Sequence, residues 1–150
     1  MPKRNILFVA WCGGERHEPV NLDYFMQVNP GMAENWEIVG AIELEGVAAG
    51  TGDSAVLWRG TRERLSDVIR RAARQVNAPL TTRELGLHAD PDMWPAPAQD
   101  TPSATLSWAG ADDLAHSPND TVENLDVKKL EHAGRAASLS VMVLAADPAY

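Results

Sequence analysis

The chain has 150 residues, of which 45% are hydrophobic and 23% are charged, and its formal net charge is −8 at pH 7. This size and composition are typical of a single soluble domain with a buried core. Because an acidic chain is repelled by phosphate backbones and anionic lipids, neither nucleic acid nor a membrane surface is an expected partner. Cys12 is the only cysteine, which excludes an internal disulfide and a zinc cluster of several cysteines.

Three continuous apolar runs predict strands, at residues 6–11, 36–42 and 104–108. Such runs are typical of strands buried on both faces, as in a parallel sheet covered by helices. The first run follows only two basic residues and is too short for the apolar region of a signal peptide. The sequence as it stands therefore predicts a cytoplasmic protein.

Two helices are clear from the periodicity of their apolar residues. The first follows Thr61 and has an apolar stripe at helical spacing, formed by Leu65, Val68, Ile69, Ala72 and Val76. The second follows Asp126 as its N-cap and ends at Asp147, with an apolar stripe of Val127, Leu130, Ala133, Ala137, Val141 and Leu144.

A weaker helix between the first two predicted strands is expected to stop at Pro30. Residues 46–60 show no clear pattern, and the prolines within residues 89–102 predict a long irregular loop. The alternation of strands and helices along the chain favours an α/β sandwich.

Two polar segments follow the carboxyl ends of predicted strands, where open α/β sheets bind their ligands. In the first, Glu15, His17 and Glu18 offer oxygen and nitrogen ligands to a metal, but such residues also serve simply to solvate a loop. In the second, His116 stands on a proline-containing turn with Asp120 four residues on. A carboxylate in that place orients a metal-bound imidazole by accepting its other N–H, or it only shapes the turn.

Several segments together resemble the co-catalytic zinc aminopeptidases of the bacterial leucyl aminopeptidase and aminopeptidase Y kind. Residues 4–15 resemble the strand and Glu-Glu turn of that family, and residues 39–45 resemble its Ile-Asn-Leu-Asp strand. Residues 90–94 are weakly similar to its Asp-His-x-x-Phe segment. The best match is residues 103–107 with residues 116–126, which follow the family's His-Thr-Pro-x-Asp-Thr-x-x-Asn-Leu-Asp pattern almost position by position.

The resemblance implies a three-layer α/β sandwich with a mostly parallel sheet, of which residues 1–150 form one partial domain, the C-terminal half without the N-terminal strands. In that family two zinc ions share a bridging carboxylate and a bridging water, which attacks the scissile carbonyl of a peptide substrate. Glu15, Glu45 and His116 stand where the family has zinc ligands. Trp94 and Trp108 are candidates to line a substrate pocket, although such residues are commonly core or rim aromatics.

The departures from the family pattern are equally informative. Gly14 replaces the glutamate that acts as general base, and glycine cannot accept a proton. Glu45 replaces an aspartate and is one methylene longer. The family's His-x-Asp ligand pair and its bridging aspartate lie upstream of the matched strand, and residues 88–90 have the right letters in the wrong place. At most three ligands remain, which predicts one zinc ion rather than two.

Three hypotheses follow. The chain is a metallopeptidase half-domain that a partner chain or self-association must complete, since missing strands leave sheet edges open. Alternatively, it is a non-catalytic scaffold or binding module that dimerises through its exposed sheet edge as a homo-oligomer. The third is a mononuclear hydrolase that uses Glu43 or Glu18 as its base. Enzymes of the family are often exported, and residues 1–11 show no export signal.

Overall fold

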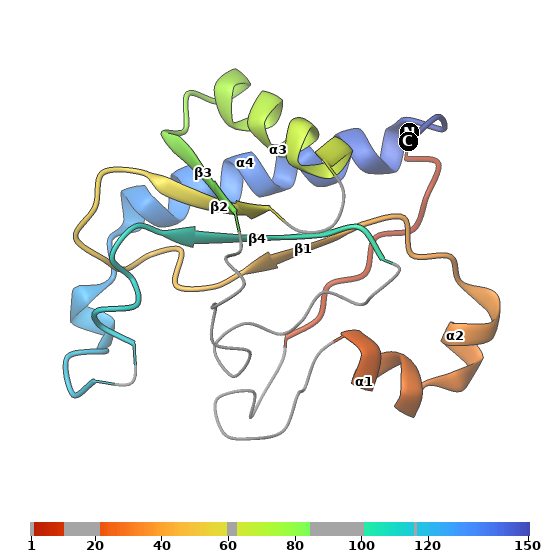
Figure 1. Ribbon diagram of the computed structural model, residues 1–150, viewed down its shortest axis with the longest axis horizontal. Helices are drawn as coiled ribbons and strands as arrows, with labels where there is room; N and C mark the ends of the chain where they lie inside the picture. The colour runs from red at the N-terminus through yellow and green to blue at the C-terminus, as the bar shows by residue number, and fades with distance from the viewer. Residues whose placement is uncertain (1, 11–21, 60–62, 85–100, 116) are drawn as a thin grey trace.

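The computed structural model describes residues 2–10, 22–59, 63–84, 101–115 and 117–150 (Figure 1). The elements in chain order are α1 (Leu22–Val28), α2 (Pro30–Asn35), β1 (Ala41–Leu44), β2 (Ala55–Arg59), α3 (Glu63–Gln75), β3 (Leu80–Glu84), β4 (Ser103–Trp108), a short 3₁₀ helix (Val122–Asn124) and α4 (Val127–Ala146). None of the described helices is long and apolar enough to cross a membrane.

The four strands form one mixed sheet in the order β1-β4-β2-β3. Two of the pairings, β1 with β4 and β2 with β3, are parallel, and only β2 with β4 is antiparallel. Leu106 lies in the middle of this arrangement, opposite Leu44 on one side and Leu57 on the other. The predicted α/β fold with a mostly parallel sheet is therefore confirmed.

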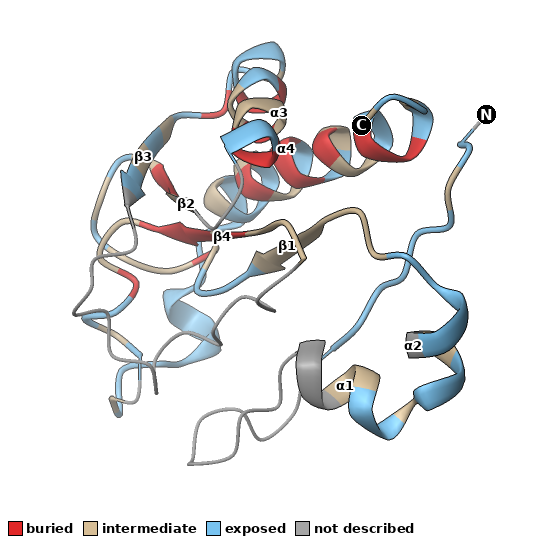
Figure 2. Ribbon diagram, turned by 45° about the vertical axis from the view of Figure 1, so that its right-hand side comes forward, coloured by how far each residue is buried: buried red, intermediate tan, exposed pale blue. Residues whose placement is uncertain are grey.

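The hydrophobic core lies between the sheet and the helices α3 and α4, which pack side by side on the same face of the sheet (Figures 1 and 2). The stripe predicted for α3 is confirmed, because Leu65 and Ile69 are fully buried against Leu57 and Leu106. Thr61, the expected cap, lies outside the described residues. The helical spacing of the stripe explains this packing, since it turns every apolar residue toward one face.

Helix α4 begins as predicted, with the side chain of Asp126 accepting hydrogen bonds from the backbone N–H groups of Lys128 at 2.8 Å and Lys129 at 3.4 Å. Its predicted apolar stripe is only partly buried. The inner part packs into the core, whereas Val127 is 78% exposed and Leu130 is 49% exposed. Part of the apolar surface of α4 is thus left uncovered by the described residues.

Two predictions about the strands are wrong. Residues 6–10 form no strand, because no described strand lies beside them to complete a ladder of hydrogen bonds, and Phe8 is 86% exposed. Of the run at residues 36–42 only Ala41 and Ile42 join β1. The first helix, α1, does end at Val28, just before Pro30, but Pro30 then begins the unpredicted α2, because proline suits a first helical position.

Two strands were not predicted at all. Strand β2 lies within residues 46–60, where glycine, alanine and threonine mask the apolar pattern, and β3 is short and polar. Both are strands because of their pairings, since β2 sits between β4 and β3 in the sheet.

Candidate functional site

The parallel pairing of β1 with β4 brings the carboxyl ends of both strands to the same end of the sheet. Glu45 directly follows β1, and its backbone N–H donates to the carbonyl of Leu106 in β4 at 2.9 Å. The segment after β4 leads within eight residues to position 116. The pairing therefore places Glu45 and the start of the segment that follows β4 at one end of the sheet.

Two loops at this end pack so closely that glycine is needed between them. Gly46 has φ of 56°, and a Cβ there would lie 2.8 Å from the Cβ of Ala111. Gly50 has φ of 102°, and a Cβ there would lie 2.6 Å from the carbonyl oxygen of Ala109. The loop that carries Glu45 and the turn that leads to His116 are thus held against each other by direct backbone contact.

The turn after position 116 is braced by its own hydrogen bonds. The backbone N–H of Asp120 donates to the carbonyl of Ser117 at 3.1 Å, and the side chain of Asn124 donates to the carbonyl of Asn119 at 2.6 Å. The backbone N–H of Asp126 donates to the carbonyl of Ala48 at 2.8 Å, which ties the turn to the loop after β1. The side chain of Asp120 is exposed, and its role toward His116 stays a prediction.

A second carboxylate, Glu43, lies within β1, two residues before Glu45. It accepts a hydrogen bond from Thr105 Oγ1 at 3.1 Å. Partial burial raises the pKa of Glu43 above its ordinary value; the Thr105 bond opposes this rise, and the charge of Glu45 adds to it. The sequence could not reveal the contact with Thr105, which depends on the register Glu43↔Thr105 between β1 and β4.

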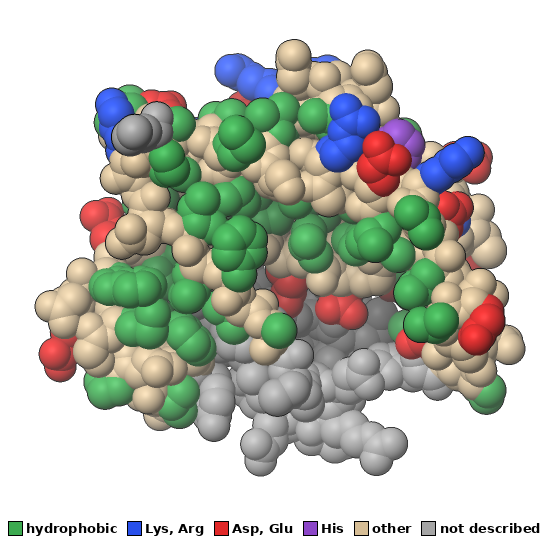
Figure 3. Space-filling model, turned by 180° about the vertical axis from the view of Figure 1, so that it is seen from behind, with side chains coloured by type: hydrophobic (Ala, Val, Ile, Leu, Met, Phe, Trp, Pro, Cys, Tyr) green, Lys and Arg blue, Asp and Glu red, His purple; other side chains and the backbone are tan. Residues whose placement is uncertain are grey.

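A groove of about 1280 Å³ runs along the open edge of β1, between that strand and residues 3–10. We call it the β1-edge groove. Glu43 and Glu45 line it together with Trp58 and Thr105, and α4 lines it with residues from Gly134 to Ala145. Figure 3 shows this face of the molecule, with hydrophobic side chains gathered over α4 and acidic side chains in the hollow below them.

Trp108 does not line this groove. It is only 4% exposed, its Nε1–H donates to the carbonyl of Gly52 at 2.7 Å, and the Lys129 ammonium lies 5.7 Å from the centre of its ring. Trp108 therefore packs as a core aromatic with its polar atom satisfied. Trp94, the other candidate for a substrate pocket, lies outside the described residues.

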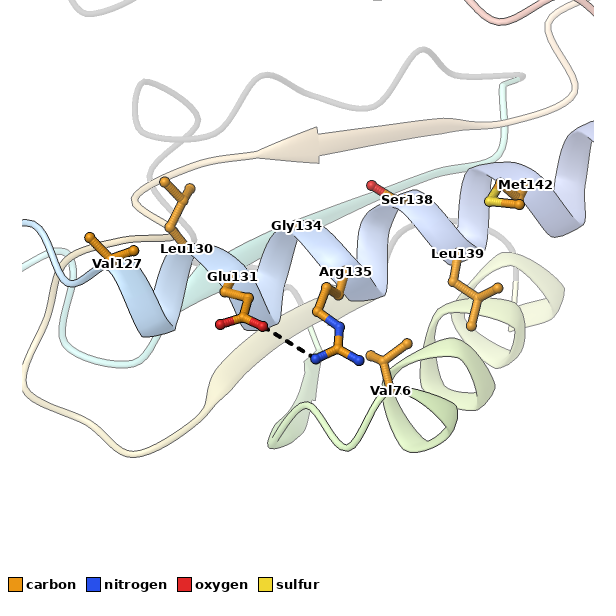
Figure 4. Close-up of a pocket in the computed structure, with 9 residues that line it drawn as sticks. All are labelled: Val76, Val127, Leu130, Glu131, Gly134, Arg135, Ser138, Leu139 and Met142. Atoms are coloured by element: carbon orange, nitrogen blue, oxygen red, sulfur yellow. Dashed lines mark hydrogen bonds and ion pairs between the residues drawn. The ribbon is translucent and has the colours of Figure 1, made fainter.

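A shallower pocket of about 530 Å³ lies on the outer side of α4, next to Val76 at the end of α3 (Figure 4). Its side chains are mostly apolar, among them Leu130, Leu139 and Met142. The exposed ion pair between Arg135 and Glu131, at 3.3 Å, borders it. Polar groups do not converge inside this pocket, so it offers no catalytic constellation.

The predicted metal ligands are only partly placed. Glu45 lies at the end of β1, whereas Glu15 and His116 lie outside the described residues, as do Gly14 and Glu18. Within the described ranges, no three histidine, cysteine, aspartate or glutamate side chains come together as a metal site. The site of Glu15, Glu45 and His116 therefore stays a prediction.

Comparisons with known proteins give a family and a fold. The family model described as "Peptidase family M28" matches residues 1–141. The structure is similar to that of the Legionella pneumophila LapA aminopeptidase, with a TM-score of 0.60 and 12% sequence identity. This match covers 81% of the chain but only 35% of LapA, so the chain spans about a third of that enzyme. A search of curated proteins found no match. The family match covers most of the sequence, and the chain therefore belongs to peptidase family M28.

Proposed function

We propose that the chain is one part of a zinc-dependent peptidase that removes N-terminal residues from peptides, and that residues 1–150 by themselves do not carry out this reaction. The observation that supports this proposal is the pairing of β1 with β4, which brings Glu45 and the start of the segment that leads from β4 toward position 116 to one end of the sheet. Membership of a peptidase family supports hydrolysis of peptides, and the likeness to an aminopeptidase fold supports the choice of reaction.

The residues at this end of the sheet suit a zinc ion. Zinc binds carboxylate oxygen and imidazole nitrogen, which Glu15, Glu45 and His116 would supply. Glu43 lies two residues before Glu45, and burial together with the charge of Glu45 disfavours charge on Glu43, a cost that a nearby cation would relieve. Bound zinc would supply Lewis acidity and lower the pKa of a coordinated water.

This chain lacks other parts of the machinery. Gly14 cannot remove a proton from a water molecule, and general-base help is typically worth about 10²- to 10⁴-fold in rate. Three ligands can hold one open zinc site but leave no bridging carboxylate for a second ion. We therefore expect one zinc per chain and no peptidase activity from the chain alone.

The alternative function is a non-catalytic scaffold that dimerises through the edge of β1. Gly14 favours it, because glycine cannot act as the catalytic base that the family has at this position. So does the edge of β1, beside which none of the described strands lies. The two functions differ in what they require of His116. A scaffold makes no use of its imidazole, whereas a zinc site loses affinity when it is removed.

The test is the zinc content of the freshly purified chain, measured by elemental analysis, beside that of His116→Ala and Glu123→Ala. Glu123 is an exposed residue of the short 3₁₀ helix and serves as the matched control. We expect about one zinc in the natural chain and in the control and none in His116→Ala. Absence of zinc from the natural chain, together with no stabilisation by added zinc, would contradict the proposal. Turnover of aminoacyl anilides by the chain alone would contradict its incompleteness.

A further inference from the structure

The loop after β1, residues 46–52, has no charged side chain, so ion pairs cannot hold it in place. It is held through its backbone instead, because three of its carbonyl groups, at alternate positions, accept hydrogen bonds from other parts of the chain. We call these bonds the carbonyl clamp. They run from Asp126 N–H to Ala48 at 2.8 Å, from the ammonium of Lys129 to Gly50, and from Trp108 Nε1–H to Gly52 at 2.7 Å.

All three donors of the carbonyl clamp belong to the segment that encloses position 116. Trp108 is the last residue of β4, before that position, and Asp126 and Lys129 lie at the start of α4, after it. The loop that they hold begins directly after Glu45, which is the predicted zinc ligand that the structure describes. The carbonyl clamp therefore joins the two segments that carry predicted ligands.

Lys129 is the donor that acts through a charged side chain. This residue is half-buried, and its ammonium lies over the ring of Trp108, 5.7 Å from the ring centre. An ammonium that is partly removed from water needs acceptors, and here the carbonyl of Gly50 and the aromatic ring supply them. A hydrogen bond with a charged donor is about twice as strong as a neutral one, so the ammonium is well suited to fix a loop of small residues.

We infer that Lys129 is a positioning residue, which holds the loop after Glu45 in a fixed place relative to the segment that leads to position 116, and thereby shapes the predicted zinc site. It acts through the carbonyl of Gly50. The inference rests on the proposed function, because it concerns the same end of the sheet. Loss of residues that orient metal ligands typically costs about 10- to 100-fold in metal affinity.

The first measurement follows the loop by amide hydrogen exchange, with a chelator present so that no metal is bound. Lys129→Met keeps the aliphatic part of the side chain and removes the ammonium. We expect exchange at Gly52, whose N–H donates to the carbonyl of Ala109 at 2.9 Å, to become about tenfold faster or more. Exchange at the buried Ile69 of α3 should stay the same, because the core is not touched.

Two further variants serve as controls. Lys128→Met makes the same change of charge at the preceding residue, which is exposed, and should leave exchange at Gly52 as it is in the natural chain. Lys129→Arg keeps a charged donor within reach of the carbonyl of Gly50 and should restore most of the protection. Circular dichroism of the three variants checks that they fold.

The second measurement is the zinc affinity of the same chains by titration calorimetry. We expect Lys129→Met to bind zinc about tenfold more weakly or worse, Lys128→Met to equal the natural chain, and Lys129→Arg to come close to it. A lysine that only stabilised the fold would not change the zinc affinity of a chain that is already folded, so this comparison separates positioning from stability.

Unchanged exchange at Gly52 in Lys129→Met would overturn the inference, and so would equal zinc affinities of Lys129→Met and Lys128→Met. A natural chain that binds no zinc would contradict the proposed function. The exchange measurement contains no metal, so it would then still decide whether Lys129 positions the loop.

Discussion

The replacement Gly50→Ala tests whether the loop after β1 holds the turn that leads to His116. Gly50 has φ of 102°, and the added Cβ would lie 2.6 Å from both the carbonyl oxygen of Ala109 and the backbone N of Ala111. The unfavourable backbone conformation costs about 1–3 kcal/mol. Relief of the contact with two backbone atoms, which cannot rotate away as a side chain can, costs about another 1–3 kcal/mol.

The expected loss of unfolding free energy is therefore about 4 kcal/mol, which lowers the midpoint of thermal unfolding by roughly 8–16 °C for a chain of this size. Calorimetry or circular dichroism measures it, and the zinc affinity of the variant should fall as well, because the displaced turn precedes His116. The matched control is Gly134→Ala, where an added Cβ meets no atom within 4 Å. Alanine is the better helix former there, so the control should gain about 1 kcal/mol.

A Gly50→Ala variant that melts within about 2 °C of the natural chain would refute this reasoning, because neither the strained backbone nor the close contact could then exist. A loss in Gly134→Ala as large as that in Gly50→Ala would also refute it, since both substitutions would then act only by adding a methyl group.

Three further predictions concern stability. Leu106→Ala, at a position with no exposed surface in the centre of the sheet, should cost about 3–5 kcal/mol in chemical unfolding, and the half-exposed Leu130→Ala far less. Arg4→Ala should lose about 1.5–3 kcal/mol because its guanidinium donates to the carbonyls of Leu144, at 2.7 Å, and Asp147, and Arg4→Lys should recover only part of it; equal stability of all three chains would contradict this role. The pKa of Glu43 is raised in the folded chain, so folding is favoured below the ordinary glutamate pKa and this contribution is lost as pH rises through the folded value. With a chelator present, Glu43→Gln should therefore be more stable than the natural chain at pH 7 and no more stable near pH 4; the reverse order would show that the Thr105 bond outweighs burial.

Some features of the candidate site could be predicted from the sequence, and others became visible only in the structure. Glu15, Glu45 and His116 were named from a resemblance in short motifs, and the sequence also showed that Gly14 removes the general base. The sequence could not show that Glu45 donates through its backbone to Leu106, because that contact joins residues 61 positions apart. Trp108 was a candidate pocket residue, and only the structure shows it buried with its Nε1–H bound to Gly52.

The sequence by itself determined the elements whose cause is local. Helices α3 and α4 follow from apolar residues at helical spacing, and the start of α4 follows from Asp126, which caps residues two and three positions away. The tertiary structure decided the strands, because a strand exists only with a neighbour to bond to. The polar β3 is a strand because β2 pairs with it, whereas the apolar residues 6–9 are not, since no described strand lies beside them.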